Sequence, residues 1–92
     1  MLNQIALVGT LSEKPVYVGN GILGINCYRA VITLETEEAE KQNIDIYLWK
    51  QIAEVIEEKY EEGTLVAVKG FLLQDNDHLY IITARISFIT AQ

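Results

Sequence analysis

The sequence predicts an all-β domain, a small five-stranded barrel with one α-helix between the third and fourth strands. Five segments are rich in β-branched and aromatic residues, which is typical of strands. One segment instead carries apolar residues four positions apart, as an amphipathic helix does. Two of the predicted strands contain an interior glycine, which often marks a bulge or a sharp bend in a barrel.

The N-terminal half contains the first three predicted strands, over Gln4–Leu11, Asn26–Glu35 and Asn43–Trp49. Ser12–Pro15 is expected to break the first run, which Pro15–Val18 resumes briefly. Gly19-Asn20-Gly21 is a turn signal because glycine and asparagine tolerate tight backbone conformations. The polar, acidic stretch Thr36–Gln42 is expected to be a loop.

The period of the apolar residues changes after the third strand. Lys50–Glu62 places Ile52, Ile56 and Tyr60 four apart, with charged residues on the other face, and this predicts an amphipathic helix. Gly63 stands where a helix C-cap glycine belongs, so the helix is expected to run to Glu62.

The last two strands are expected over Thr64–Leu73, with Gly70 inside it, and Leu79–Thr90. A tight polar loop, Gln74–His78, joins them. Helices do not alternate with strands, which disfavours a parallel doubly wound sheet. Three strands, one helix and two strands is the order of an OB-fold, a five-stranded Greek-key barrel. A small α+β sheet with one packed helix is the alternative.

The length of 92 residues, half of them apolar, is enough for one domain spanning positions 1–92 with its own core. A lone cysteine, Cys27, lies in an apolar stretch and is expected to be a small buried hydrophobe. The N-terminus shows no signal peptide, and no apolar run approaches the ~20 residues that span a bilayer. These features predict a cytoplasmic protein with no membrane partner.

The sequence lacks the residue motifs that are typical of enzyme active sites. There is one histidine, and there is no Cys/His metal spacing, phosphate-binding glycine loop or nucleophile elbow. The pairs Glu57-Glu58 and Glu61-Glu62 lie on or near the outer helix face and are interpreted as solvated charge. We therefore expect no catalytic residues, no metal and no cofactor.

Several stretches, taken together, resemble bacterial single-stranded DNA-binding proteins. They are Met1–Leu11 (MLNQIALVGTL), Val31–Leu34 (VITL), Tyr47–Gly63 (YLWKQIAEVIEEKYEEG) and Thr64–Gly70 (TLVAVKG), in the family's order and at similar spacing. The resemblance implies an OB-fold and sequence-independent binding of single-stranded DNA by a dimer or tetramer. It also implies roles in DNA replication, recombination and repair. The acidic tail by which family members recruit other proteins is not expected, since the sequence stops at Gln92.

Sequence-independent binding of single-stranded DNA needs aromatic rings on which bases stack and cations placed along the phosphates. Trp49 falls where the resembled family places a stacking aromatic, and strand alternation puts Tyr47 on the same face. The candidate nucleic-acid contacts are Trp49, Tyr47, Arg29, Thr33, Lys50, Lys69 and Arg85. A second interpretation of Trp49 is that it covers the start of the helix or packs at a subunit contact.

The sequence departs from the resembled family in its charge. Asn43 and Asp45 replace a tryptophan and a basic residue, and the loop after the second strand is acidic. The net charge is −6, the wrong sign for a polyanionic partner. We therefore expect weak DNA binding with a shallow salt dependence. The alternative is a protein-interaction module or a primosome-like accessory protein, whose acidic loops bind a basic partner such as a helicase or recombinase.

The last two strands are apolar on both faces, and this predicts self-association. Leu65, Ala67, Phe71 and Leu73 are expected on one outer face of the fourth strand; Tyr80, Ile82, Ile86 and Phe88 are expected to share one face of the fifth. One barrel interior covers only one face of each strand, so the other needs a partner. The packed helix and the barrel ends are the simpler explanation. The expected assembly is a homodimer or homotetramer.

Overall fold

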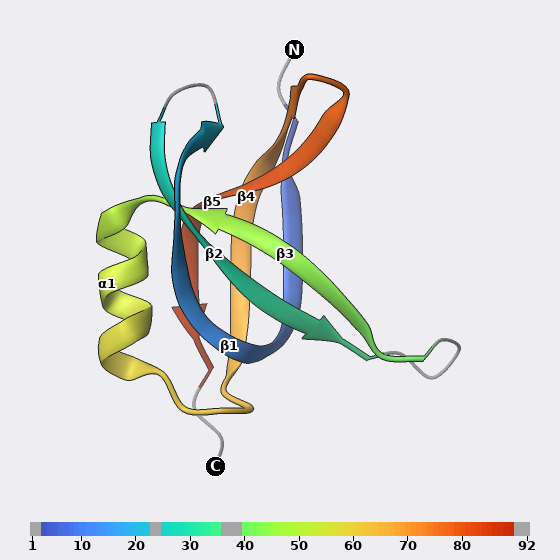
Figure 1. The fold of residues 1–92 in the computed structure, drawn as a ribbon. Coiled ribbons are helices and arrows are strands. Elements are labelled where there is room, and N and C mark those ends of the chain that lie inside the picture. The colour runs from blue at the N-terminus through green and yellow to red at the C-terminus, as the bar shows by residue number, and fades with distance from the viewer. Residues whose placement is uncertain (1–2, 23–24, 36–39, 90–92) are drawn as a thin grey trace.

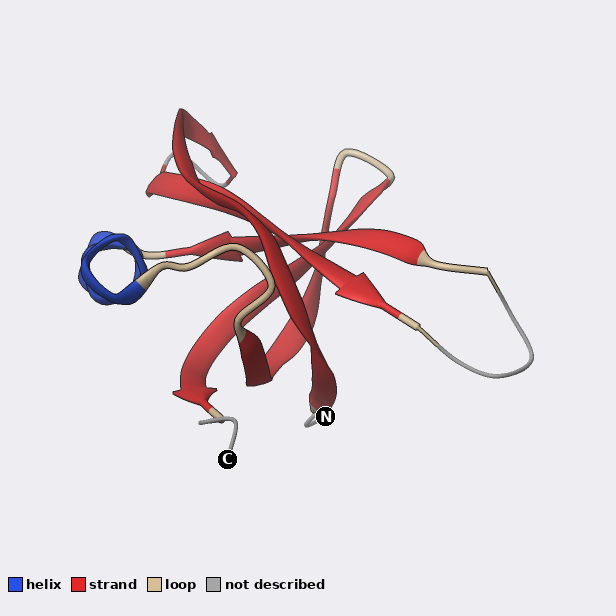
Figure 2. Cartoon of the chain, turned by 90° about the horizontal axis from the view of Figure 1, so that it is seen from below, coloured by secondary structure: helices blue, strands red, loops and turns tan. Residues whose placement is uncertain are grey.

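The computed structural model describes residues 3–22, 25–35 and 40–89. Five strands and one helix follow one another as β1 (Ile5–Ile22), β2 (Ile25–Leu34), β3 (Gln42–Leu48), α1 (Lys50–Lys59), β4 (Leu65–Asp75) and β5 (His78–Phe88). The strands form a closed barrel in the order β1-β2-β3-β5-β4, with α1 beside it (Figures 1 and 2). The predicted fold class is confirmed. Within the described ranges, no helix combines the length and apolarity needed to cross a bilayer.

The long first strand joins the two halves of the barrel. β1 pairs antiparallel with β2 from Thr10 onward and with β4 from Ile5 to Thr10. β3 and β5 run parallel and meet at Tyr47 and Ile82, and this contact closes the barrel. The β1–β2 and β4–β5 hairpins both project at the upper end in Figure 1.

The predicted break in the first strand was wrong. β1 continues through Ser12–Pro15, and the pairing with β2 shifts register between Leu11 and Glu13 and again between Glu13 and Val16. These irregularities accommodate Pro15, which has no N–H to donate to a ladder. The predicted turn at Gly19–Gly21 also belongs to β1, where Gly19 has a φ of +81° at a third irregularity.

The helix is shorter than its apolar pattern predicted. It starts at Lys50, but Tyr60 is extended with a ψ of 132°, so the prediction that it continues to Glu62 was wrong. Gly63, with a φ of +83°, is not the helix cap and instead donates its N–H to the carbonyl of Leu11 at 3.1 Å. Hydrogen bonds to the barrel and within the turn therefore end the helix early and direct the chain into β4.

The β4–β5 connection is a two-residue turn. Asn76 and Asp77 have φ values of +51° and +64°, the signature of a type I′ hairpin. The predicted loop Gln74–His78 was too long, because Gln74 and His78 are strand residues. The predicted end of the last strand, Thr90, lies outside the described residues, and β5 itself ends at Phe88.

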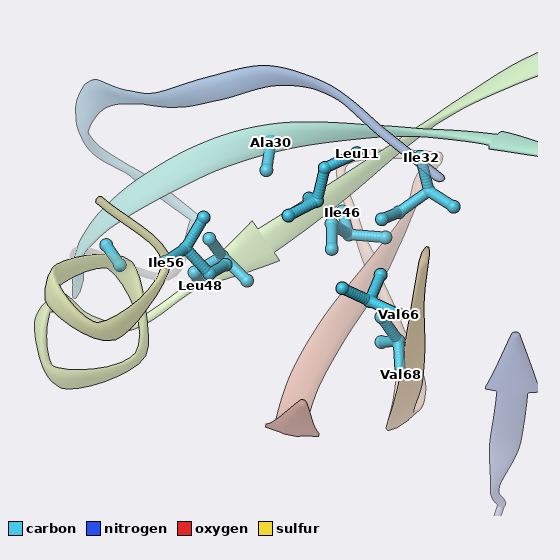
Figure 3. Close-up of a cluster of buried hydrophobic side chains, with 9 residues drawn as sticks. Leu11, Ala30, Ile32, Ile46, Leu48, Ile56, Val66 and Val68 are labelled. Carbon is cyan, nitrogen blue, oxygen red and sulfur yellow. The ribbon is translucent and has the colours of Figure 1, made fainter. Parts of the chain in front are cut away.

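The core lies inside the barrel and under the helix. Its buried members are Leu11, Ala30, Ile32, Ile46, Leu48, Ala53, Ile56, Val66 and Val68 (Figure 3). The side chains of β3 alternate, as the predicted placement of Tyr47 by strand alternation requires: Ile46 and Leu48 are buried, while Asn43 and Asp45 are exposed. Ile56 of the helix packs with this core beside Leu48.

The side chain of Thr83, in β5, buries a hydroxyl group. Thr83 is fully buried, and its Oγ1 has no partner among the described residues. A buried unsatisfied polar group costs ~1–3 kcal/mol, so Thr83→Val, which keeps the shape, is expected to raise the free energy of unfolding by ~1–2 kcal/mol. Urea unfolding measures this change. The matched control is Thr64→Val, which loses the 2.6 Å hydrogen bond to the Glu61 carbonyl and should lose stability. Loss of stability in Thr83→Val would contradict the prediction.

Candidate nucleic-acid interface

A bulge in β5 decides which side chains face outward. Lys69 lies opposite Arg85, but Gly70 lies opposite Thr83, so Ala84 has no opposite residue on β4. An extra residue in one strand reverses the alternation of side chains beyond it.

The bulge overturns one prediction from the alternation of the last strand. Ile86 and Phe88 pair with Val68 and Val66 on the core side. Ile82 and Tyr80 instead pair with Phe71 and Leu73 on the outer side of the sheet. The prediction that Tyr80, Ile82, Ile86 and Phe88 share one face was therefore wrong, because it assumed an unbroken alternation.

The outer side of the barrel carries a row of residues that crosses four strands. Arg29 of β2 lies opposite Tyr47 of β3, Tyr47 lies opposite Ile82 of β5, and Ile82 lies opposite Phe71 of β4. Cross-strand neighbours stand close together on the same face of a sheet. Segments from distant parts of the sequence therefore form one continuous surface.

We call the apolar part of this surface the aromatic patch. Five partly buried side chains pack against the buried Cys27 and Ile82: Tyr47, Trp49, Phe71, Leu73 and Tyr80. The rings of Tyr47 and Tyr80 meet edge to face, with centroids 5.0 Å apart, and the His78 ring lies 5.3 Å from that of Tyr80. These contacts hold the rings in place while part of each side chain stays accessible.

Cys27 is the buried support of the aromatic patch, as expected of a small hydrophobe. Burial raises the pKa of its thiol, which disfavours the reactive thiolate. Tyr47 is affected in the same direction: burial, and then the nearby Asp45 carboxylate, raises its pKa, although Arg29 opposes the shift. The Tyr47 ring therefore stays neutral and adds no negative charge to the patch at neutral pH.

Trp49 connects the aromatic patch to the helix. It is the N-cap residue of α1, and its carbonyl accepts a 3.0 Å hydrogen bond from the N–H of Ala53. Its side chain packs with the Cys27–Ile82 cluster. The backbone of Trp49 therefore begins the helix, while its indole lies in the aromatic patch.

Three predicted cations stand beside the aromatic patch. Arg29 is the cross-strand neighbour of Tyr47. Lys69 and Arg85 lie opposite each other, on the side of the Phe71–Ile82 pair away from Leu73 and Tyr80. Asp45 is the nearby carboxylate on β3, two residues from Tyr47 and on the same side of the strand.

The structure does not bring the other two predicted residues into this group. The Thr33 hydroxyl donates to the Asn43 side chain at 2.9 Å, near the far end of the β2–β3 pair. Lys50 forms an exposed ion pair with Glu54 at 3.9 Å along the helix.

Most of the acidic residues of the C-terminal half lie on the helix side, at Glu54, Glu57, Glu58, Glu61 and Glu62. Part of the predicted acidic loop, positions 36–39, lies outside the described residues.

Three members of the aromatic patch were not among the predicted nucleic-acid contacts. Phe71, Leu73 and Tyr80 were predicted to lie on self-association faces. Their place beside Tyr47 depends on the β3–β5 contact and on the bulge at Ala84, neither of which has a local sequence signal. Among the described residues, no group of three or more His, Cys, Asp or Glu side chains is placed to hold a metal ion.

The strand order, closed barrel and single helix define the class of the protein, which is an OB-fold. The chain belongs to the single-strand binding protein family, whose model matches residues 2–78. Proteins of this family are binding proteins without catalytic activity, and the chain is not an enzyme.

Solved structures share the fold at low sequence identity. The mitochondrial single-stranded DNA binding protein Rim1 of S. cerevisiae has a TM-score of 0.80 and 12% identity, over 100% of this chain and 98% of Rim1. The N-terminal domain of PriB from Thermoanaerobacter tencongensis, described as dimeric, has a TM-score of 0.73 and 20% identity, over 97% and 98%. The single-stranded DNA binding protein of Thermus aquaticus has a TM-score of 0.73 and 22% identity, and the match covers 99% of this chain but 42% of that one. No curated protein matches the sequence.

Proposed function

We propose that this protein binds single-stranded DNA without sequence preference, with bases stacked on the aromatic patch and phosphates beside Arg29, Lys69 and Arg85. The observation that carries the proposal is the patch itself, with four aromatic rings gathered on one outer face of an OB barrel. Stacking on aromatic side chains tolerates any sequence because every base has a π-face. Membership of the single-strand binding protein family supports the same function.

The expected binding depends more on stacking than on charge. Each stacked base contributes ~1–3 kcal/mol. Three cations that each neutralise one phosphate give a salt slope of only about −2 per protomer, at ~0.7 for each phosphate on single strands. The net charge of −6 further weakens the attraction to phosphates. Binding is therefore expected to be weak and to change little with salt.

The decisive experiment is a fluorescence titration of Trp49 with oligo-dT longer than ~16 nucleotides at low salt. We expect quenching of the single tryptophan. In anisotropy with labelled oligo-dT, Trp49→Ala is expected to weaken binding about tenfold, since one lost stacking contact costs ~1–3 kcal/mol.

Tyr17→Ala is the matched control for this titration. Tyr17 is 55% exposed and packs on Tyr28, away from the aromatic patch. Its loss should leave oligo-dT affinity unchanged. Absence of binding at low salt would contradict the proposal and favour a protein-interaction module. A steep salt slope would contradict the small contribution expected from charge.

We also infer self-association through the exposed apolar side chains on the outer face of the β1–β4 pair. Val8 is 60% exposed and lies opposite Ala67, and the exposed Leu65 lies opposite Thr10. Exposed apolar side chains clustered on a sheet face favour burial against a second copy. The dimeric PriB domain supports a homodimer or homotetramer. We propose that such an assembly acts on unpaired DNA in the cytoplasm during replication, recombination or repair.

A further inference from the structure

A second recessed surface lies between the barrel and the helix. Pro15 of β1, Tyr28 of β2, and Ala53, Glu54 and Glu57 of α1 line a groove of about 210 Å³, which we call the helix groove. Tyr28 stands between Cys27 and Arg29 in β2, and neighbouring residues of a strand face opposite sides. The helix groove is therefore on the opposite side of β2 from the aromatic patch.

The floor of the helix groove is apolar and well supported. The Tyr28 ring meets the Tyr17 ring edge to face, with centroids 5.3 Å apart. The Tyr17 hydroxyl in turn donates a 3.0 Å hydrogen bond to the side chain of Asn26. Pro15 and the buried Ala53 complete the floor with side chains that have few or no rotamers. A ligand that stacks on Tyr28 meets a ring already held in position.

The rim of the helix groove is acidic. Glu54 and Glu57 are three residues apart, so they lie on the same side of the helix. Their side chains are 65% and 54% exposed, and each has an exposed lysine partner, Lys50 at 3.9 Å and Lys14 at 3.6 Å. Exposed pairs of this kind contribute little stability, so an incoming cation displaces them at small cost.

Beside the groove, the Lys14 ammonium already lies between a carboxylate and an aromatic ring. The Lys14 ammonium lies within ion-pair distance of Glu57 and 5.9 Å from the centre of the Tyr60 ring. Carboxylates next to an aromatic face attract cations by charge and by the ring quadrupole. A guanidinium fits such a groove better than an ammonium because it is planar, stacks on rings and binds carboxylates through two parallel hydrogen bonds.

We propose that the helix groove docks an arginine side chain from a protein partner, stacked on Tyr28 and paired with Glu54 and Glu57. The negative charge of Glu58 on the same helix adds to that of the rim and attracts a basic segment. Because the groove and the aromatic patch lie on opposite sides of β2, the chain binds such a segment and single-stranded DNA at the same time.

An NMR titration of the ¹⁵N-labelled full chain tests this proposal. The probe is the peptide acetyl-Gly-Leu-Arg-Gly-Leu-Arg-amide, and its counterpart carries neutral citrulline in place of arginine. Saturable shifts are expected at the amides of Tyr28, Ala53, Glu54 and Glu57. The citrulline peptide should bind at least about tenfold more weakly because it lacks the charge. Equal affinities, or shifts that avoid the groove, would overturn the proposal.

Two double variants distinguish peptide binding in the helix groove from attraction to the overall negative charge of the protein. Glu54→Gln with Glu57→Gln is expected to weaken arginine-peptide binding about tenfold. Glu61→Gln with Glu62→Gln removes the same charge outside the groove lining and should change the affinity less than about twofold. Equal losses in the two variants would refute a defined site. Displacement of the peptide by oligo-dT would also refute it, by placing the peptide on the aromatic patch.

Discussion

Gly70→Ala is expected to lower the free energy of unfolding by about 3 kcal/mol, the upper range for overpacking a well-packed core. A Cβ at position 70 would overlap the carbonyl oxygen of Ile82 and lie 2.9 Å from its carbonyl carbon. The obstacle is backbone of the neighbouring strand, so a change of rotamer does not relieve it. β4 and β5 would have to separate at the bulge that positions Ile82 and Phe71.

Urea unfolding measures the loss in Gly70→Ala, and the Trp49 emission spectrum reports whether the aromatic patch is disturbed. Gly19→Ala is the matched control. Gly19 has a φ of +81°, but a Cβ at this position would have no neighbouring atom within 4 Å. The cost of Gly19→Ala is therefore that of the left-handed backbone alone, ~1–2 kcal/mol. A smaller loss in Gly70→Ala than in Gly19→Ala would contradict the close-packing argument.

The double substitution Phe71→Leu with Tyr80→Leu is expected to weaken oligo-dT binding at least about tenfold, since stacked bases contribute ~1–3 kcal/mol each. Leucine keeps apolar contact with Cys27 and Ile82 but removes the two π-faces. The variant should therefore fold and keep its assembly state. Anisotropy with labelled oligo-dT measures the affinity, and light scattering measures the mass.

Val8→Glu is the matched control, because it is expected to change the assembly state and to leave DNA affinity unchanged. Val8 is exposed on β1, opposite Ala67, outside the aromatic patch. Its charge is expected to lower the assembly mass at micromolar concentration while the DNA affinity of each protomer stays close to that of the parent chain. Unchanged DNA affinity in the leucine double variant, or a drop in its mass, would show that Phe71 and Tyr80 serve self-association instead.

Charges of opposite sign lie at the two proposed sites, so the aromatic patch and the helix groove are expected to bind different ligands. Arg29, Lys69 and Arg85 flank the aromatic patch, whereas Glu54 and Glu57 border the helix groove. An acidic protein of net charge −6 thereby keeps local cations where phosphates are expected to lie. Glu54 and Glu57 of the helix border the groove on the other side of β2 from the proposed DNA surface. The net charge of −6 in this member of the single-strand binding protein family is therefore compatible with the proposed DNA surface.

Local pattern determined much of the fold. The β-branched runs located all five strands, and the four-residue spacing of Ile52, Ile56 and Tyr60 located the helix. The alternation in β3 correctly separated buried Ile46 and Leu48 from the opposite face that carries Tyr47. Such signals succeed because burial on one side of a regular element repeats at the period of that element.

Element ends were less predictable. Gly63 resembles a helix cap in sequence, but its N–H bonds to Leu11, more than fifty residues earlier in the chain, and the helix stops at Lys59. Pro15 predicts a break, but bulges opposite β2 keep β1 continuous around it. In both places a hydrogen-bond partner distant in sequence overrides the local preference.

The sequence by itself determined the order of the elements, the buried face of β3 and the outward position of Tyr47. The tertiary structure alone decided that Phe71, Leu73 and Tyr80 join Trp49 in one patch, and that Tyr28 and Glu57 border one groove. The physical reason is that a bulge reverses side-chain alternation and barrel closure brings together strands that are distant in sequence. Neither event leaves a periodic signal along the chain.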